Sequence, residues 1–302
     1  MDIVLAGGTG FIGRALREAL IARGDSVTLL TRDETAANSD WGLMKAVLWD
    51  GKTSGDWAAA VDGADAVINL SGESVAEGRW TPERKLALTK SRLDSTRALV
   101  AAIASARKRP KVFLSASAVG YYGIAPEGVM TESSPQGSGF LAALCGQWER
   151  EAYAAEKLGV RVATLRLGVV LGGDGGALAK MALPFKLFVG GPLGAGAQHL
   201  PWVHRDDVVG GILFLLDHEK VFGPVNLAAP HALRNEEFSE ALGRALHRPS
   251  WAPAPAFLIR LALGEMAEMI LGGQHAEPHR LLDAGYEFKH PTAEAALADI
   301  LG

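Results

Sequence analysis

The first two thirds of the chain alternate between short apolar runs and longer segments with helical periodicity. The apolar runs read as buried strands at residues 2–6, 26–31, 46–49, 64–70, 111–115 and 160–167. Helical spacing of apolar residues is clearest at 11–23, 82–106 and 140–158. Continuous apolar strands joined by helices indicate a parallel sheet covered on both faces. The pattern therefore predicts a doubly wound α/β fold.

After residue 167 the pattern loosens into glycine-rich loops around a short predicted helix near 177–188. Further helices are predicted at 206–217 and 235–247, with a strand between them at 224–228. A proline-rich stretch, PSWAPAPA, then leads into a last helical segment and a tail. We predict a main domain at 1–170, to which 204–230 returns. A smaller lobe would consist of 171–203 and 231–302.

Composition is typical of a globular protein, since 48% of the 302 residues are hydrophobic. The net charge of −4 gives no reason to expect nucleic acid or acidic membranes as partners. No apolar run reaches the ~20 residues of a membrane span. The opening MDIVLAGG also lacks the basic and apolar regions of a signal peptide. We expect a cytoplasmic protein with no membrane partner.

The chain has one cysteine, Cys145, which excludes an intramolecular disulfide and a cysteine-based metal cluster. Such sparse use of cysteine is typical of a reducing compartment. We interpret Cys145 as a buried small hydrophobic residue rather than a nucleophile. The sequence gives no reason to expect a metal site.

A glycine-rich turn joins the first predicted strand to the first predicted helix. In VLAGGTGFIGRAL the glycines at 7, 10 and 13 recur every three residues. They match a dinucleotide-binding turn, in which they allow the turn, leave room for the pyrophosphate and let the helix pack closely. The pyrophosphate would lie against N–H groups at the positive end of the helix. The residues assigned to this cradle are Gly7, Thr9, Gly10, Phe11, Ile12 and Gly13.

The end of the second strand favours the phosphorylated coenzyme. A carboxylate there would hold a ribose 2′-hydroxyl, whereas this strand ends at Thr31 and Arg32. A hydroxyl and a guanidinium suit a 2′-phosphate. Asp33 is expected to point to solvent or cap a turn. We predict NADP(H) as the cofactor in preference to NAD(H).

The fourth strand ends in a small-residue turn, where the ligand crevice of a parallel sheet lies. We assign Leu70, Ser71 and Gly72 of this turn to the adenosine half of the cofactor. Arg92, on the long helix at 82–106, either faces the same crevice or lies in solvent.

Several motifs together resemble the extended short-chain dehydrogenase/reductase superfamily: GGTGFIG, NLSGE, SASAVGYYG, RLGVVLG and PWVHRDD. WE at 148–149, GGPLGAGAQ, GE at 264–265, GGQ at 272–274 and the closing GYEF are similar to one branch, the NAD(P)-dependent epimerase family proteins. Members of this branch have also been described as sugar-nucleotide epimerases and cell-division inhibitors. The resemblance covers essentially the whole chain. It implies a Rossmann domain and a nicotinamide cofactor, and no particular substrate.

In that superfamily a serine, a tyrosine and a lysine one helical turn later surround the nicotinamide. The serine position lies at the end of the fifth strand, where Ser115 and Ser117 both qualify. The tyrosine and lysine positions fall on Phe140 and Leu144, and neither side chain can transfer a proton. With Trp148 these two form an apolar stripe that we predict to pack against the sheet.

A tyrosine and a lysine with the right spacing do occur further along, at Tyr153 and Lys157. They lie thirteen residues beyond the expected position, which is about 20 Å at 1.5 Å per residue. We interpret Tyr153 as a surface residue and Lys157 as a cation favoured by the C-terminal end of the helix.

Other polar residues could supply the missing chemistry. Tyr121 and Tyr122 follow the fifth strand; either replaces the proton donor, or both form aromatic walls of the pocket. Glu132 is a candidate acid or base, or a carboxylate that caps a turn. We assign Glu132, Gln198, Trp202 and His204 to the substrate pocket, which Arg166 and His199 also help to shape. Asp206 or Asp207 is predicted to cap the helix at 206–217.

The sequence thus predicts an NADP(H)-binding oxidoreductase of the atypical short-chain type, acting on an unknown small carbonyl or alcohol. Ser117 would polarise the substrate oxygen, and Tyr121 or Tyr122 would handle the proton. One alternative is a non-catalytic module that senses redox state through NADPH; another is a sugar-nucleotide epimerase. The resemblance also implies a homodimer formed through the helices at 82–106 and 140–158.

Overall fold

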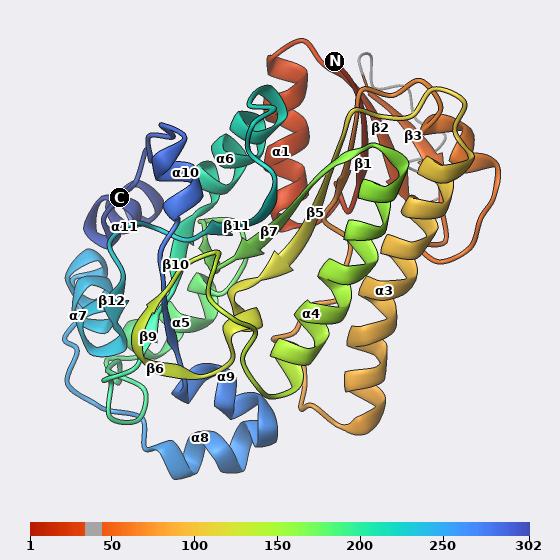
Figure 1. The fold of residues 1–302 in the computed structure, drawn as a ribbon. Helices are drawn as coiled ribbons and strands as arrows, with labels where there is room; N and C mark the ends of the chain where they lie inside the picture. Colours follow the sequence, from red (N-terminus) through yellow and green to blue (C-terminus); the bar gives the residue numbers. More distant parts are fainter. Residues whose placement is uncertain (34–43) are drawn as a thin grey trace.

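The computed structural model of the chain describes residues 1–33 and 44–302. Within these ranges the centre of the molecule is a seven-stranded parallel sheet with the order β3-β2-β1-β4-β5-β7-β11 (Figure 1). Its strands are β1 (Asp2–Ala6), β2 (Ser26–Thr31), β3 (Met44–Leu48), β4 (Ala66–Asn69), β5 (Val112–Ala118), β7 (Arg161–Leu167) and β11 (Gly223–Leu227). The order reverses between β1 and β4, as in a doubly wound sheet. The predicted fold class is confirmed.

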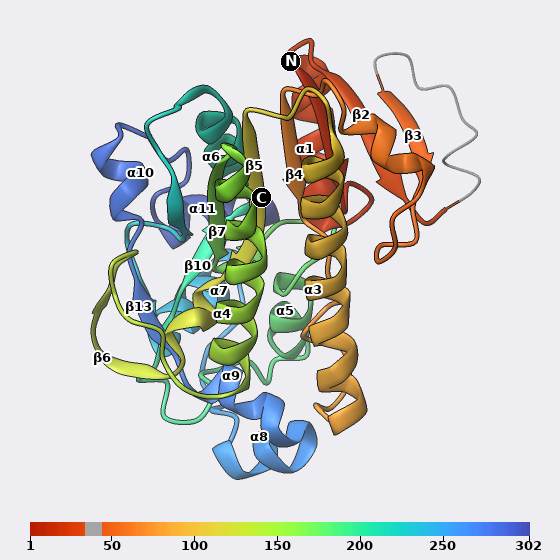
Figure 2. The ribbon, with the colours of Figure 1, turned by 45° about the vertical axis from the view of Figure 1, so that its right-hand side comes forward.

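Helices cover both faces of this sheet (Figure 2). On one face lie α1 (Phe11–Ala22) and α6 (Arg205–Asp217), and on the other lie α3 (Pro82–Ser105) and α4 (Phe140–Tyr153). Side chains of a strand alternate between the faces. In β1, Ile3 and Leu5 join the core beneath α1, whereas Val4 and Ala6 join the core beneath α3. The sheet is therefore buried on both sides, which is why its strands are continuously apolar.

A third core lies in the C-terminal part of the molecule, around Trp202, Phe238 and Leu297. The helices of this part are α5 (Leu178–Lys186), α7 (Asn235–Leu246), α8 (Ala256–Leu263), α9 (Ala267–Leu271), α10 (His279–Asp283) and α11 (Ala293–Leu301). Three two-stranded pairs complete it: β8 (Val169–Leu171) with β10 (Trp202–His204), β9 (His199–Leu200) with β12 (Leu233–Arg234), and β6 (Ala125–Met130) with β13 (Gln274–Ala276). The division into a main domain and a smaller lobe at residue 170 stays a prediction.

The elements agree closely with the sequence pattern, with one informative difference at the end of α4. The helix predicted at 140–158 ends as an α-helix at Tyr153 and continues as a 3-10 turn, η3 (Ala154–Leu158), before Gly159 adopts φ +80°. The strand predicted at 224–228 is β11, the outer strand of the main sheet beside β7. In the described residues no helix is both long enough and apolar enough to cross a bilayer.

Candidate functional site

The predicted cradle lies at the carboxyl ends of β1 and β4, and two of its glycines are sterically required. Gly7 has φ +82°, and a Cβ atom there would lie 2.6 Å from the backbone carbonyl of Leu70. A Cβ atom on Gly13 would lie 2.2 Å from the carbonyl oxygen of Gly7 and 2.5 Å from the Cα of Gly8. No side chain fits at these distances. The backbone of β1 therefore approaches both β4 and the first turn of α1.

The N-terminus of α1 is left open by its own sequence. Gly10 is the N-cap residue and supplies no side-chain hydrogen bond, and the first turn carries no acidic residue. The backbone N–H of Gly10 donates to the carbonyl oxygen of Gly7 at 3.1 Å, which closes the turn. The next N–H groups, starting with those of Phe11 and Ile12, head the helix at its positive end. Thr9, just before them, is exposed.

A second glycine-rich loop closes against the cradle. Gly175 and Gly176, in the loop between β8 and α5, approach the ring of Phe11 so closely that a Cβ would lie about 3 Å from it. Arg205 places its guanidinium 5.2 Å from the centre of the same ring and pairs with Asp174 of the loop. The loop is therefore tied to the start of α1.

The end of β2 keeps the arrangement predicted for a phosphorylated ribose. Thr31 is buried and its Oγ1 accepts the backbone N–H of Asp33 at 3.1 Å, which leaves the hydroxyl proton available. Arg32 is exposed. Thr31 and Arg32 are thus adjacent in the chain at the carboxyl end of β2, the strand that pairs with β1.

The turn after β4 is held by side chains from α3. Asn69 is fully buried; its Nδ2 donates to Thr96 Oγ1 at 3.0 Å and its Oδ1 accepts the N–H of Ser71 at 3.1 Å. Arg92 donates to the carbonyl oxygens of Leu88 and Glu73 at 3.0 and 2.9 Å. Burial lowers the pKa of Arg92. Arg92 thus faces the turn rather than solvent and fixes the backbone where Leu70 and Gly72 were assigned.

The two serines of β5 differ in their surroundings. Ser115 is fully buried, and no hydrogen bond is found for its Oγ among the described residues. Ser117, two residues nearer the carboxyl edge, donates to Glu149 Oε1 of α4 at 2.7 Å. The hydroxyl proton of Ser117 is therefore committed to a carboxylate.

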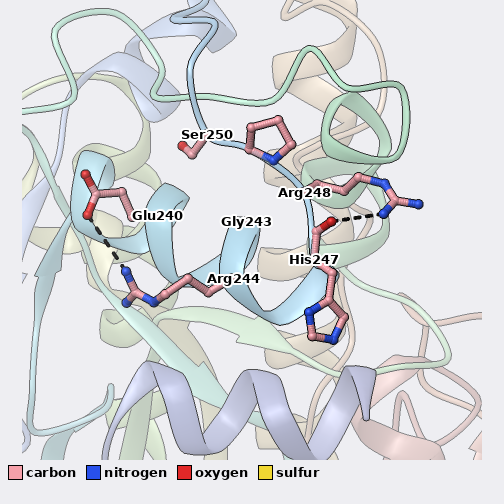
Figure 3. Close-up of a pocket in the computed structure, with 7 residues that line it drawn as sticks. Glu240, Gly243, Arg244, His247, Arg248 and Ser250 are labelled. Atoms are coloured by element: carbon pink, nitrogen blue, oxygen red, sulfur yellow. Dashed lines mark hydrogen bonds and ion pairs between the residues drawn. The ribbon is translucent and has the colours of Figure 1, made fainter.

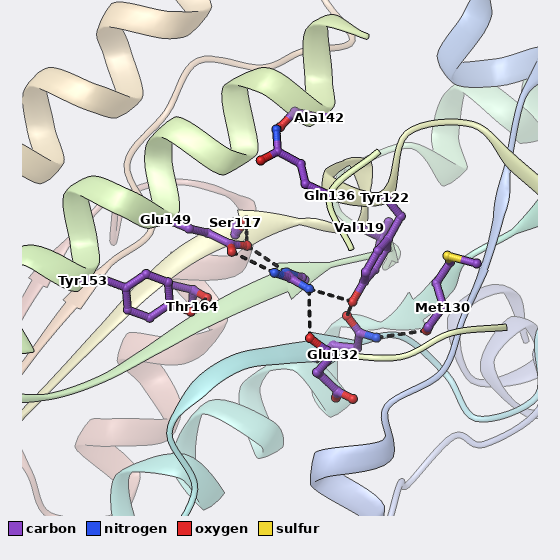
Figure 4. Close-up of polar contacts among 12 residues, drawn as sticks. Ser117, Val119, Tyr122, Met130, Glu132, Gln136, Ala142, Glu149, Tyr153 and Thr164 are labelled. Carbon is purple, nitrogen blue, oxygen red and sulfur yellow. Dashed lines mark hydrogen bonds and ion pairs between the residues drawn. The ribbon is translucent and has the colours of Figure 1, made fainter. Parts of the chain in front are cut away.

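That carboxylate belongs to a buried ion pair between α4 and β7 (Figure 4). Arg166 binds Glu149 in a bidentate manner, through Nε at 2.8 Å and Nη2 at 2.9 Å. Both side chains are at most 5% exposed. Burial opposes the charge on Arg166, yet the hydrogen bonds and the charge of Glu149 outweigh it, so the pKa of Arg166 is raised. Loss of either partner would leave the charge of the other buried and uncompensated.

The tyrosines that follow β5 join the same network. Tyr122 is buried; its hydroxyl donates to Asn226 Oδ1 at 2.6 Å and accepts Nη1 of Arg166 at 3.0 Å. Burial raises the pKa of Tyr122. The ring of Tyr121 stacks on the guanidinium of Arg166, 3.5 Å from its centre. Among the described residues no hydrogen bond is found for the Tyr121 hydroxyl.

A cavity of about 510 Å³ opens on this network, on the α4 side of β7 and β11. It brings together Tyr121, Glu132 and Arg166, three residues assigned to the site from the sequence. Glu132 is itself 5% exposed, and its Oε1 accepts the N–H groups of Asn226 and Arg280 at 3.1 and 3.2 Å. The carboxylate of Glu132 thus serves as a hydrogen-bond acceptor for backbone N–H groups of β11 and α10. Its role as an acid or base stays a prediction.

The first turns of α4 carry no proton donor. Phe140 begins the helix and packs edge-on against Trp80 at 5.3 Å, and Leu144 is buried beside it. The predicted stripe does not pack on the sheet throughout: Phe140 and Leu144 contact Leu88 of α3 and Met266 of the C-terminal part. The prediction that Phe140 and Leu144 pack against the sheet is wrong, because the first turns of α4 pack against α3 and the C-terminal part instead.

Comparison with known proteins assigns the fold to a family. Residues 3–228 match the NAD dependent epimerase/dehydratase family, and residues 254–300 match a domain of unknown function, DUF1731. The first match alone spans well over half of the chain. The chain belongs to the NAD-dependent epimerase/dehydratase family. The predicted resemblance to the extended short-chain dehydrogenase/reductases, and with it a nicotinamide dinucleotide site, is confirmed at the level of the family.

Relatives cover the chain from end to end. A chloroplastic SDR39U1 homologue from Arabidopsis thaliana, described as an epimerase family protein, is 41% identical over 306 residues, covering 100% of this chain and 87% of the relative. The epimerase family protein SH2119 of Staphylococcus haemolyticus is 38% identical, covering 99% of both chains. The crystal structure of human SDR39U1 with NADPH has a TM-score of 0.89 at 35% identity, covering 100% of this chain and 99% of the human one.

Other members of the predicted pocket serve structural roles in this epimerase-family chain. Trp202 is 1% exposed and lies in the third core, so its ring faces packed side chains. Gln198 donates to the carbonyl oxygens of Leu193 and Ile270 at 3.0 and 3.3 Å, which ties a loop to α9. His199 stacks on His275 at 4.8 Å, and burial followed by the charge of His275 lowers the pKa of His199. Their roles toward a substrate stay predictions.

The start of α6 differs from the sequence prediction. The N-cap is His204, whose Nδ1 accepts the N–H of Asp206 at 3.0 Å. Asp207, predicted as a possible cap, is 1% exposed and accepts the N–H groups of Lys289 and His290 at 2.6 and 2.9 Å. The prediction of an aspartate cap is wrong, because the carboxylate of Asp207 instead accepts backbone N–H groups more than eighty residues away in the sequence.

Tyr153 also differs from its predicted surroundings. It is partly buried rather than a surface residue, and its hydroxyl lies 2.8 Å from Thr164 Oγ1 of β7. Burial raises the pKa of Tyr153 to about 12. Thr164 lies in the middle of β7, and Tyr153 lines the same cavity as Tyr121 and Arg166. The interpretation that Tyr153 and Lys157 take no part in catalysis stays a prediction.

A second cavity, of about 550 Å³, lies at the end of α7 (Figure 3). Arg244 and Glu240 pair across one side of it at 3.9 Å, and Arg248 donates to the carbonyl oxygen of His247 at 2.9 Å. None of the residues assigned from the sequence lines this cavity. The sequence in turn missed Glu149 and Asn226, although the WE motif contains the first of them.

Proposed function

We propose that the chain binds NADP(H) where β1, β2 and β4 end, and uses it for hydride transfer to or from a small carbonyl or alcohol. The observation that carries the proposal is the cradle, in which Gly7 and Gly13 leave no room for a Cβ and α1 begins without a side-chain cap. Open N–H groups at a helix N-terminus bind phosphate. The residues present therefore fit a dinucleotide.

The choice of NADP(H) is supported at the end of β2. Arg32 is exposed and follows Thr31 directly in the chain, and a guanidinium binds phosphate oxygens in a planar, charge-assisted manner. The human relative, 35% identical, was crystallised with NADPH. The bound nicotinamide would supply or accept the hydride. The chain would supply the binding groups and the proton.

Two residues are our candidates for handling the substrate oxygen. Ser117 lies at the carboxyl end of β5, and its hydroxyl would have to turn from Glu149 to a substrate to donate a hydrogen bond. Tyr121 is the preferred proton donor, since the hydroxyl of Tyr122 is engaged with both Asn226 and Arg166. Arg166, stacked on Tyr121, would stabilise the phenolate that a proton transfer leaves.

The sequence of α4 favours a second function, that of a non-catalytic binding module. The first turns of α4 place Phe140 and Leu144 where a reductase carries a tyrosine and a lysine. A chain without these groups could bind NADPH and signal its presence without turnover. Epimerisation of a sugar nucleotide has less support, because two cations that could bind its phosphates are engaged elsewhere: Arg205 pairs with Asp174, and Lys180 donates to the carbonyl oxygen of Ala76.

A turnover screen separates these functions. The purified protein is loaded with NADPH, and loss of absorbance at about 340 nm is followed with quinones, aldehydes and sugar nucleotides. We expect turnover with a carbonyl compound, lost on Tyr121→Phe by about 100-fold or more while the affinity for NADPH stays unchanged. Binding of NADPH without turnover across the panel would contradict hydride transfer and support the binding module.

A further inference from the structure

Four side chains with metal-binding chemistry meet where the C-terminal segment packs against the start of α6. His204 and Asp206 come from that start, His290 from the loop before α11, and Asp299 from α11 itself. One possible ligand atom from each lies within 4.8 Å of the others. In the ranges that the structure describes, this is the one group of histidine and acidic side chains so arranged. It is separate from the cradle and from the network around Glu149.

The two histidines are buried and incompletely bonded. Their side chains are 4% and 7% exposed, and the Nε2 atoms of both His204 and His290 have no hydrogen-bond partner in the described structure. Their rings are in contact, with centres 4.0 Å apart and planes tilted by 39°. A buried polar atom without a partner is unfavourable unless a ligand satisfies it. Here both such atoms lie within 4 Å of the same oxygen, Asp299 Oδ2.

The distances suit a small divalent cation. Asp299 Oδ2 lies 3.4 Å from His204 Nε2 and 3.9 Å from His290 Nε2. Ligands bound tetrahedrally to Zn²⁺ at about 2.0–2.2 Å lie about 3.3–3.6 Å apart. The carboxylates of Asp206 and Asp299 are 39% and 47% exposed. They can therefore move inward and admit a cation from solvent while the histidines stay in place.

We propose that His204, His290, Asp299 and Asp206 form a zinc-type site that clamps the C-terminal segment to the main body. Two imidazoles and two carboxylates are a donor set that Zn²⁺ and Co²⁺ accept in four-coordinate geometry. The two carboxylates balance the charge of the ion. The proposal does not depend on the cofactor or on turnover. It departs from the expectation of no metal, because the pair His204 and Asp206 is separated from the pair His290 and Asp299 by 84 residues, and such a separation forms no spacing motif.

Binding has a definite consequence for α6. Nδ1 of His204 accepts the N–H of Asp206, so the neutral ring carries its proton on Nε2. A metal bound at Nε2 moves that proton to Nδ1, and the N–H of Asp206 then loses its acceptor. Asp206 must also share its carboxylate with Lys289, whose Nζ lies 2.7 Å from Oδ2. The site should therefore have a lower affinity for the metal ion than a site whose ligands have no other hydrogen-bond or ion-pair partners.

Cobalt provides the direct test. Co²⁺ is titrated into the full-length protein, with its visible absorption bands as the signal for four-coordinate binding, and Zn²⁺ is then added as a competitor. We expect one Co²⁺ per chain, displaced by Zn²⁺, and a higher melting temperature with either ion. In ¹⁵N-labelled protein the amide of Asp206 should shift on binding, since it changes partner.

Variants decide whether these residues hold the ion. Asp299→Asn changes an exposed side chain and should leave the fold intact while weakening Co²⁺ binding by about 10-fold or more; His290→Gln should do the same. The controls are His231→Gln and Asp283→Asn, two exposed residues outside the cluster. Absence of four-coordinate bands at millimolar Co²⁺, or binding that Asp299→Asn leaves unchanged, would overturn the proposal.

Discussion

At the scale of single residues, Cys145 illustrates how the fold changes the chemistry of a group. The thiol lies inside α4 and is 3% exposed. Burial, followed by the charge of Glu149, raises the pKa of Cys145 to about 12. A thiolate is the reactive form. The residue is therefore inert at neutral pH, as its apolar neighbours in the sequence suggested.

This shift predicts both low reactivity and a loss of stability in alkali. Above about pH 8.5 the thiol of the unfolded chain ionises, whereas the folded chain keeps its proton until about pH 12. The folded state then binds more protons, so the free energy of unfolding falls as the pH rises through this window. Cys145→Ala should reduce the decrease in the free energy of unfolding with pH by up to about 1.4 kcal/mol per pH unit.

Urea unfolding between pH 8 and 10, together with thiol labelling of native and unfolded protein, measures this effect. Tyr153 contributes a slope of the same sign from about pH 10 upward, where a tyrosine of the unfolded chain ionises, since its pKa is also raised to about 12. The variant should therefore retain pH dependence mainly at the upper end of this range. Labelling of the native thiol as fast as that of the unfolded chain would show that Cys145 is accessible after all.

The sequence identified the right types of polar residue near β5 and could not identify their partners. SASAVGYYG suggested Ser117 and two tyrosines, and all three lie where the strand ends. The hydroxyl of Ser117 meets Glu149 and that of Tyr122 meets Asn226, 32 and 104 residues away. Such pairings depend on how α4 and β11 lie across the sheet. No local pattern encodes them.

At the scale of elements, the ion pair of Glu149 and Arg166 fixes α4 to β7. Replacing one partner of a buried pair leaves the other charge uncompensated. Glu149→Gln should therefore lower the free energy of unfolding by about 3–5 kcal/mol. The measurement is urea denaturation at neutral pH, with the slope of each transition compared to check that the unfolding remains two-state.

The same helix offers a matched control. Glu151 also pairs with an arginine, Arg97 on α3, but that arginine side chain is 54% exposed. An exposed pair is worth less than about 1 kcal/mol, so Glu151→Gln should have little effect. Equal losses for the two variants would mean that burial does not set the strength of the pair at Glu149.

Strands were easier to predict than the ends and faces of helices. The bounds of β1 and β2 agree with the apolar runs, because each strand is buried on both faces and is followed by a glycine or a polar residue. The faces of α4 were harder, since Phe140 and Leu144 pack against α3 and the C-terminal part rather than the sheet. An apolar stripe shows that a helix face is buried and not what buries it.

At the scale of the whole molecule, the C-terminal segment is held by contacts of very long range in sequence. Asp207 of α6 accepts the backbone N–H groups of Lys289 and His290, and the hydroxyl of Tyr286 donates to the carbonyl oxygen of Asp207 at 3.1 Å. These contacts join the region matched by the epimerase family to the region matched by DUF1731. The glycine motif predicted the cradle by itself, whereas nothing local predicted this junction.

The cradle is therefore the part of the molecule on which the functional account depends, and calorimetry with NADPH and NADH tests it most directly. A charge-assisted hydrogen bond contributes about 1.5–3 kcal/mol, so Arg32→Ala should weaken NADPH binding by about 10- to 100-fold and leave NADH binding nearly unchanged. Arg107→Ala, at a side chain 94% exposed, is the control and should alter neither. Absence of binding of either coenzyme to the unmodified protein, or equal losses for both in Arg32→Ala, would contradict the account.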